Sequence, residues 1–222
     1  MSIAQNLTQI KSQLPANVTL VAVSKTKPVA DLMEAYTAGQ RIFGENKIQE
    51  MTEKWEQMPK DIEWHMIGHV QTNKVKFMAE YVSLIHGVDS LKLLQEINKQ
   101  AKKHNRVIDC LLQIHIAEEE TKFGLNEEEL NHILTSDDFK SLENIRIVGL
   151  MGMATFTENQ NQIEKEFNHL KSIFDKLNKL SIINYQLSIL SIGMSGDYQL
   201  AISCGSTMVR IGSSIFGTRN YQ

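Results

Sequence analysis

Eight short apolar runs alternate with segments of helical spacing along the chain, and this alternation restricts the possible folds more than any other feature. Most of the runs are continuously apolar, which is typical of parallel strands covered on both faces. Eight strand–helix units without a long linker predict a single α/β domain over residues 1–222, folded as a (β/α)8 TIM barrel. The runs lie at 18–25, 41–46, 63–69, 81–89, 109–116, 145–153, 185–194 and 207–217.

The segments between the runs have the spacing of amphipathic helices. Apolar residues in the segment 163–177 step by 4, 3, 4 and 3 residues, which gives the clearest helical stripe. A doubly wound sheet is the alternative, but it would normally bring a GxGxxG turn after the first strand, and the sequence has none. Further helices are expected at 29–36, 48–58, 72–80, 91–101, 126–137 and 196–203, and one at 3–13 is expected to close the barrel floor.

Composition excludes several classes of protein. The 222 residues are 42% hydrophobic and 22% charged, and the net charge of −3 does not indicate a nucleic-acid surface. The sequence has neither a signal-peptide pattern nor an apolar stretch of about 20 residues, so no membrane association is expected. Cys110 and Cys204 are far apart and form no CxxC motif, which favours a reduced, cytoplasmic protein without a disulfide framework.

Lys25 stands at the end of the first apolar run. In a barrel of this kind, functional groups lie at the carboxyl ends of the strands. A partly dry barrel mouth would lower the pKa of a lysine there and free its lone pair for attack on a carbonyl, as in Schiff-base lysines. The charge of Lys27 would lower that pKa further. The alternative is a lysine that only extends its ammonium into solvent.

The segments after the seventh and eighth runs have the features of a phosphate site. Ser195 is expected to cap a short helix, and a helix N-terminus offers free N–H groups to an anion. Gly212 and Ser213 would supply the second half, because barrels often bind phosphate with these two loops. Ordinary capping and packing are the alternative for these residues.

Arg210 lies inside the apolar run 207–217 and needs a partner, because an unpaired buried charge is costly. The partner would be an acceptor on a ligand or a nearby carboxylate. His65 and His69 have a spacing that suits zinc on a helix, but they fall on a strand and turn, so no metal site is expected. The other polar residues expected at strand ends are Glu45, Asn46, His86, Asp89 and His115.

A Schiff-base lysine, a phosphate cradle and an arginine would together suit a phosphorylated aldehyde, namely pyridoxal 5′-phosphate (PLP). The sequence resembles the pyridoxal phosphate homeostasis proteins, also called the proline synthase co-transcribed family, over nearly its whole length. Seven ordered segments carry the resemblance: VAVSKTKP (21–28), FGENKIQE (43–50), WHMIGHVQTNK (64–74), TKFG (121–124), GLMGM (149–153), LSIGMSGDYQLAI (190–202) and GSTMVRIGSSIFG (205–217).

The resemblance implies a barrel like the N-terminal domain of alanine racemase, with PLP held on Lys25 as an internal aldimine. It places Arg210 opposite the pyridine nitrogen and Ser195, Gly212 and Ser213 near the phosphate, with Thr207 as a further candidate. Asn46 and Met194 match pocket positions. The implied cofactor-binding residues are therefore Lys25, Asn46, Met194, Ser195, Thr207, Arg210, Gly212 and Ser213.

We expect a PLP carrier rather than an enzyme. An arginine stays protonated, so the ring nitrogen that it faces stays unprotonated and the ring is a poorer electron sink. Racemisation also needs a second acid–base group, which alanine racemases take from a C-terminal domain. That domain is expected to be absent here; Tyr198 or His115 would have to substitute.

No robust catalytic activity is demonstrated for the family that the sequence resembles. The resemblance implies a role in vitamin B6 and amino-acid balance. A monomer is expected, with PLP-dependent apoenzymes as possible recipients of the cofactor. A weak racemase-like enzyme remains an alternative. A phosphosugar aldolase is another, but it would need Glu45 or Asp89 beside its Schiff-base lysine.

Overall fold

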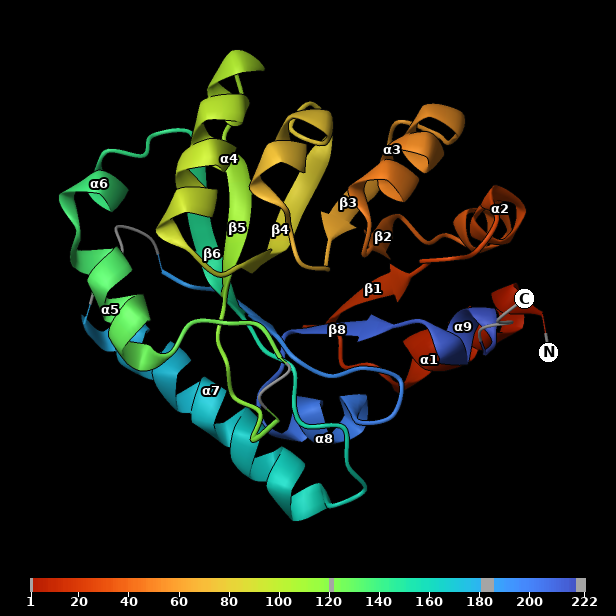
Figure 1. The fold of residues 1–222 in the computed structure, drawn as a ribbon. Helices are drawn as coiled ribbons and strands as arrows, with labels where there is room; N and C mark the ends of the chain where they lie inside the picture. Colours follow the sequence, from red (N-terminus) through yellow and green to blue (C-terminus); the bar gives the residue numbers. More distant parts are fainter. Residues whose placement is uncertain (1, 120–121, 181–185, 219–222) are drawn as a thin grey trace.

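Eight parallel strands close into a barrel in which every strand pairs with its sequence neighbours and β8 pairs with β1 (Figure 1). The structure is a computed structural model, and it describes residues 2–119, 122–180 and 186–218. The predicted (β/α)8 barrel is confirmed. The strands are β1 (Thr19–Val23), β2 (Ile42–Glu45), β3 (Glu63–Met66), β4 (Val82–Val88), β5 (Ile108–Gln113), β6 (Ile145–Met151), β7 (Ile189–Ser191) and β8 (Met208–Ile211).

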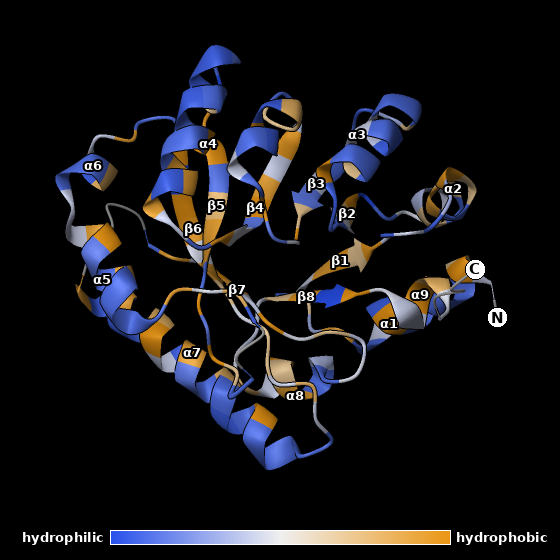
Figure 2. Ribbon diagram, in the orientation of Figure 1, coloured by the Kyte–Doolittle hydropathy of each residue, from blue (hydrophilic) through white to orange (hydrophobic). Residues whose placement is uncertain are grey.

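Helices surround the barrel, with hydrophilic residues on their outer faces (Figure 2). Their starts follow from local capping: the Ser90 hydroxyl accepts a hydrogen bond from the N–H of Leu93, and Asn126 forms a capping box with Glu129. None of the described helices is both long and apolar enough to cross a bilayer. The helices are α1 (Ile3–Gln13), α2 (Val29–Thr37), α3 (Ile48–Gln57), the 3-10 helix η1 (Thr72–Phe77), α4 (Leu91–Lys103), α5 (Glu127–Thr135), α6 (Asp137–Lys140), α7 (Gln160–Leu180), α8 (Tyr198–Ser203) and α9 (Ser213–Phe216).

The apolar core has two layers separated by the strands. Val21 and Met208 pack inside the barrel, whereas their strand neighbours Ala22 and Val209 pack outward against the helices. This alternation follows from the two-residue period of a strand. It lets each polar residue on a strand be assigned to the barrel interior or to the layer beneath the helices.

Several predicted elements differ in extent or position. The run 207–217 is only partly a strand, because Gly212 ends it and α9 follows. The expected helix at 126–137 is divided by Ser136, which caps the separate α6. The helix at 3–13 forms, but α1 packs beside α2 and α9 in the outer ring instead of across the barrel floor (Figure 1). Tyr185, the first residue of the predicted seventh strand, lies outside the described residues.

Candidate cofactor site at the carboxyl end of the barrel

Lys25 lies in the turn that joins β1 to α2, at the carboxyl end of the barrel, which we call the mouth. The turn is closed by a 3.1 Å hydrogen bond from the N–H of Lys27 to the carbonyl of Ser24. Thr26 adopts a left-handed conformation with φ of 64°, which is uncommon for a residue with a branched side chain. Its N–H donates to the carboxylate of Glu50 at 2.5 Å, which helps to hold this turn. Lys25 itself is half-buried.

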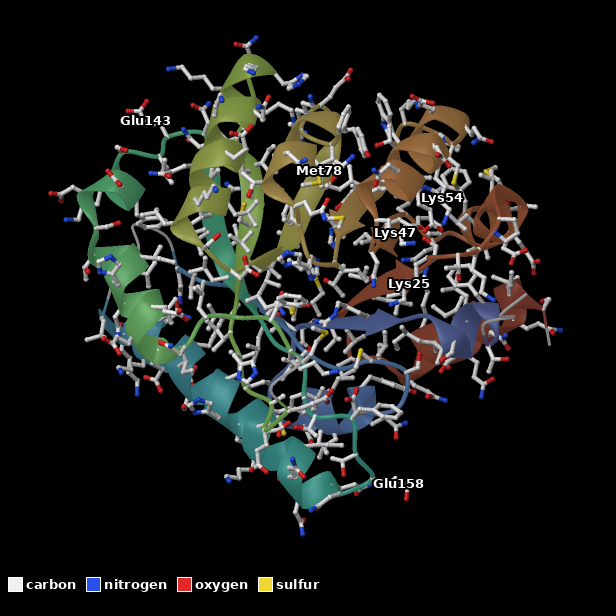
Figure 3. All side chains as sticks on the ribbon, in the orientation of Figure 1. Lys25, Lys47, Lys54, Met78, Glu143 and Glu158 are labelled. Carbon is white, nitrogen blue, oxygen red and sulfur yellow. The ribbon has the colours of Figure 1, made fainter. Side chains whose placement is uncertain are left out.

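A buried ion pair supports this turn from the layer beneath the helices. The ammonium of Lys54, on α3, donates to Oε1 of Glu45 at 2.8 Å, to Oε1 of Glu50 at 2.7 Å and to the carbonyl of Ser24 at 2.8 Å. The hydroxyl of Ser24 also donates to Glu45 Oε1, at 2.6 Å. These four residues form what we call the Lys54 cluster, which connects β2 and α3 to the turn of Lys25. Figure 3 labels Lys54 and Lys25.

Glu45 therefore does not line the mouth as expected for a strand-end residue. It shares the outward side of β2 with Phe43, because strand residues two apart face the same way. Its side chain is fully buried, and desolvation raises the pKa of the carboxyl while Lys54 opposes that rise. Its second oxygen has no hydrogen-bond partner in the described part of the chain. Glu45 is a structural group beneath the turn of Lys25.

The loops after β7 and β8, which are the predicted phosphate site, lie in contact with each other. The N–H of Gly212 donates to Oγ of Ser195 at 3.2 Å, which joins the two loops. A side chain at Gly212 would place its Cβ 3.0 Å from the carbonyl oxygen of Val23, so the glycine allows the close approach of β8 to β1. Ser213 is exposed and begins α9.

The helix after β7 begins later than predicted. Its N-cap is Asp197 rather than Ser195, and the Asp197 carboxylate accepts the N–H of Met194 at 2.5 Å. Desolvation raises the pKa of Asp197, while the hydrogen bond from Met194 and the charge of Arg210 oppose that rise. Ser195 is therefore a residue of the loop, and its hydroxyl lies beside Gly212 instead of capping a helix.

Arg210 projects into the barrel interior, on the same side of β8 as Met208. It is buried, and its Nη1 donates to the carbonyl and the hydroxyl of Ser191 at 2.8 and 2.7 Å, while Nη2 donates to the carbonyl of Gly152 at 3.1 Å. No salt bridge to Arg210 is found among the described residues. Burial lowers its pKa to about 10, opposed by the charge of Asp197. Two of its five N–H groups have no partner in that part of the chain, so they are available to a ligand.

Two histidines share the barrel interior with this arginine. Nδ1 of His86 lies 3.1 Å from Oγ of Ser191, and its Nε2 lies 3.1 Å from Nδ1 of His65. Burial lowers the pKa of His65 to about 3 and that of His86 well below its usual value. His69 lies apart from His65: its ring is 3.3 Å from the Asp89 carboxylate. The two histidines of the HxxxH segment therefore do not converge on a common site.

The remaining residues predicted to bind the cofactor lie on three separate segments of the chain. Thr207 precedes β8, and its hydroxyl accepts the N–H of Leu190 at 2.9 Å, so the whole of β8 separates it from Gly212. The assignment of Thr207 to the phosphate, which the resemblance implied, is therefore corrected, because Thr207 lies at the amino end of β8 and the phosphate loops follow its carboxyl end. Asn46 follows β2 and approaches the end of β3 closely, and Met194 is 37% exposed in the loop after β7.

The two substitutes considered for a racemase acid–base group are both bound elsewhere. The hydroxyl of Tyr198 lies 2.5 Å from Oε1 of Gln13, at the end of α1. Nε2 of His115 lies 3.2 Å from the carbonyl of Glu119. Ser191 and Lys54, the partners of Arg210 and Glu45, were not predicted from the sequence. Strand alternation could have identified Ser191 as an inward-facing residue, because it places Ser191 on the inner side of β7 with Ile189.

Residues 1–220 match the family model of the alanine racemase N-terminal domain. A pyridoxal phosphate homeostasis protein of Pasteurella multocida is 38% identical, over 100% of this chain and 99% of that protein. One of Aquifex aeolicus is 39% identical, over 91% of this chain and 87% of the other. The chain belongs to the pyridoxal phosphate homeostasis protein family.

Solved structures agree with this family. PipY of Synechococcus elongatus, in its structure with PLP bound, superposes with a TM-score of 0.89 and 34% identity, over 97% of this chain and 100% of that one. An alanine racemase of Clostridium difficile gives a TM-score of 0.81 at 19% identity, over 100% of this chain and 58% of that chain. The likeness to the racemase shows the shared barrel alone, whereas the likeness to PipY is to a barrel that was solved with PLP bound.

Proposed function

We propose that the protein is a single-domain PLP carrier that holds the cofactor at the barrel mouth, covalently on Lys25, and supports intracellular PLP and amino-acid homeostasis. The observation that carries this proposal is that three groups come from β1, β7 and β8 or from the segments that follow them, and these strands are neighbours in the closed barrel. The three groups are the amine of Lys25, the joined loops of Ser195 and Gly212, and the buried guanidinium of Arg210. The PLP-bound structure of PipY, a relative at 34% identity, supports the same ligand.

The residues present fit PLP. When bound, PLP supplies an aldehyde that condenses with a primary amine and releases one water. Lys25 supplies the amine, and the loop groups of Ser195, Gly212 and Ser213 hold the phosphate. The two N–H groups of Arg210 that have no partner among the described residues would be available to the ring nitrogen. Asn46 and Met194 would help to hold the ring.

The arrangement favours a carrier over an enzyme. The Arg210 guanidinium is still cationic at neutral pH, because its pKa stays at about 10, so it keeps a facing ring nitrogen unprotonated. The hydroxyl of Tyr198 is held by Gln13, so it is not poised as a second acid–base group. A phosphosugar aldolase is disfavoured, because the Lys54 cluster binds the carboxylate of Glu45.

The carrier role includes exchange with other amines. We propose that an incoming amine displaces Lys25 at the mouth, where that lysine is half-buried and Met194 is partly exposed. PLP-dependent apoenzymes are the proposed recipients, and the carrier is proposed to act as a monomer. Both cysteines are free and buried, which fits a reducing compartment such as the cytoplasm.

The covalent assignment is tested by the visible spectrum and by trapping. Protein incubated with PLP is expected to show a yellow band, and borohydride is expected to fix the cofactor on Lys25, as mapped by mass spectrometry. Lys25→Ala is expected to lose both signals. Lys27→Ala is the matched control, because its ammonium donates to the carbonyl of Phe216 at 2.8 Å, and it should keep both. Label on another lysine, or a colourless wild-type protein, would contradict the proposal.

The ring assignment of Arg210 is tested by Arg210→Gln, which removes the charge at similar length. The band of the bound cofactor is expected to move, because a neutral amide no longer opposes protonation of the ring nitrogen. A pH titration of the absorbance measures this change. A titration identical to that of the wild type would remove Arg210 from the ring.

A further inference from the structure

Four buried polar side chains form a continuous chain of hydrogen bonds inside the barrel. They come from β3, β4, β7 and β8, and we call them the interior polar chain: His65, His86, Ser191 and Arg210. Their exposed fractions are 3%, 0%, 0% and 4%, so bulk water is not available to satisfy them. Every donor and acceptor must therefore be accounted for within the protein or a ligand.

The arginine fixes the direction of this chain. A guanidinium has donors only, so Nη1 of Arg210 donates to Oγ of Ser191 across their 2.7 Å separation. The hydroxyl proton of Ser191 then needs an acceptor of its own. Among the described residues, the remaining polar contact of this hydroxyl is Nδ1 of His86, at 3.1 Å. Ser191 therefore donates to His86.

The same reasoning determines both histidine tautomers. Since Nδ1 of His86 accepts, the neutral ring carries its proton on Nε2, which faces Nδ1 of His65 at 3.1 Å. His65 in turn accepts at Nδ1 and carries its proton on Nε2. The opposite direction would make His86 a second donor to Ser191 and leave the buried hydroxyl proton without an acceptor in the described part of the chain.

We propose that His86 is a positioning residue, which orients Arg210 by accepting the hydroxyl proton of Ser191 and so keeping that oxygen as an acceptor for the guanidinium. The step from Arg210 to the cofactor ring rests on the proposed function. The direction of the interior polar chain does not, because it follows from the protein groups alone. His86 therefore acts on the ring only through Ser191 and Arg210.

The direction is tested without any cofactor, by long-range 1H–15N NMR of the histidine rings in 15N-labelled protein near pH 7. His65 and His86, assigned by their loss in His65→Gln and His86→Gln, are expected to show a protonated Nε2 and a bare Nδ1. Ser191→Ala is expected to release His86 into a mixture of tautomers. Ser206→Ala is the matched control, because that buried hydroxyl donates to backbone carbonyls such as Ile192. A protonated Nδ1 on His86, or an unchanged tautomer in Ser191→Ala, would overturn the inference.

The positioning role is tested by PLP titration of two variants. His86→Leu cannot accept from Ser191 and is expected to weaken PLP binding about tenfold and to move the visible band, as for loss of one buried hydrogen-bond partner. His86→Gln retains an acceptor and is expected to stay near the wild type. Wild-type affinity and spectrum in His86→Leu would overturn the positioning role. If the wild type itself fails to bind PLP, the proposed function fails. The NMR result still decides the direction of the hydrogen bonds in the interior polar chain.

Discussion

Replacement of Lys54 by methionine is expected to lower the free energy of unfolding by about 3–5 kcal/mol, as for other buried ion pairs that lose one partner. Glu45 is fully buried, and Lys54 is its cationic partner, at 2.8 Å. Without Lys54, the carboxylate keeps its desolvation cost and loses the compensating charge. Urea unfolding near pH 7.5 measures the change.

Two further variants separate charge from packing. Adding Glu45→Gln to Lys54→Met is expected to recover part of the lost stability, because it removes the unpaired charge. Lys171→Met is the matched control: Lys171 pairs with Asp175 at 2.6 Å on the surface of α7, where such pairs contribute about 1 kcal/mol or less. A loss in Lys54→Met no larger than in Lys171→Met would contradict the role of the buried pair.

The Lys54 cluster also connects stability with the cofactor site. Glu50 accepts the N–H of Thr26, and Lys54 donates to the carbonyl of Ser24, so the cluster binds the chain on both sides of Lys25. A lysine that forms a covalent bond needs a backbone held in one place, since its own side chain is long and flexible. The segments VAVSKTKP and FGENKIQE thus contribute to one local structure.

The strand order was predictable from the sequence because each apolar run is buried on both faces. The boundaries were less predictable, as in the run 207–217, where the apolar residues of β8 and α9 follow one another with only Gly212 between. Periodicity alone does not separate a short buried strand from a short buried helix. The helix at 3–13 was predictable as an element, but its packing beside α9 depends on tertiary contacts.

The site was predictable in its parts but not in its connections. Arg210 could be assigned to the barrel interior by alternation with Val209 and Ile211. Its contact with Ser191 joins residues that are 19 positions apart in the chain, and the contact of Ser191 with His86 joins residues that are 105 positions apart. Such contacts depend on register, and β3 and β4 have a shift between Trp64 and His65. Glu45 was misplaced because the end of a strand was considered without the side that it faces.

The two interior histidines are expected to make the protein sensitive to acid. The pKa of His65 is about 3 in the folded protein and that of His86 is well below its usual value, against about 6.5 in the unfolded chain. Below pH 6.5 the unfolded state therefore binds more protons than the folded state, and stability falls as the pH falls. Between pH 8 and pH 5 His65 is expected to cost about 2 kcal/mol, and His86 acts in the same direction.

Urea unfolding across this pH range measures the loss, and variants assign it. His65→Gln is expected to reduce the slope between pH 6.5 and pH 5, because glutamine does not titrate there. His104→Gln, at an exposed position, is the matched variant for the same substitution outside the barrel interior. The raised pKa of Glu45 changes stability in the opposite direction, because at low pH the folded state binds the additional proton. The difference in slope between wild type and variant is therefore more decisive than the total loss of stability in the wild type. Equal slopes in wild type and His65→Gln would show that the His65 ring is accessible to protons in the folded barrel, contrary to its burial.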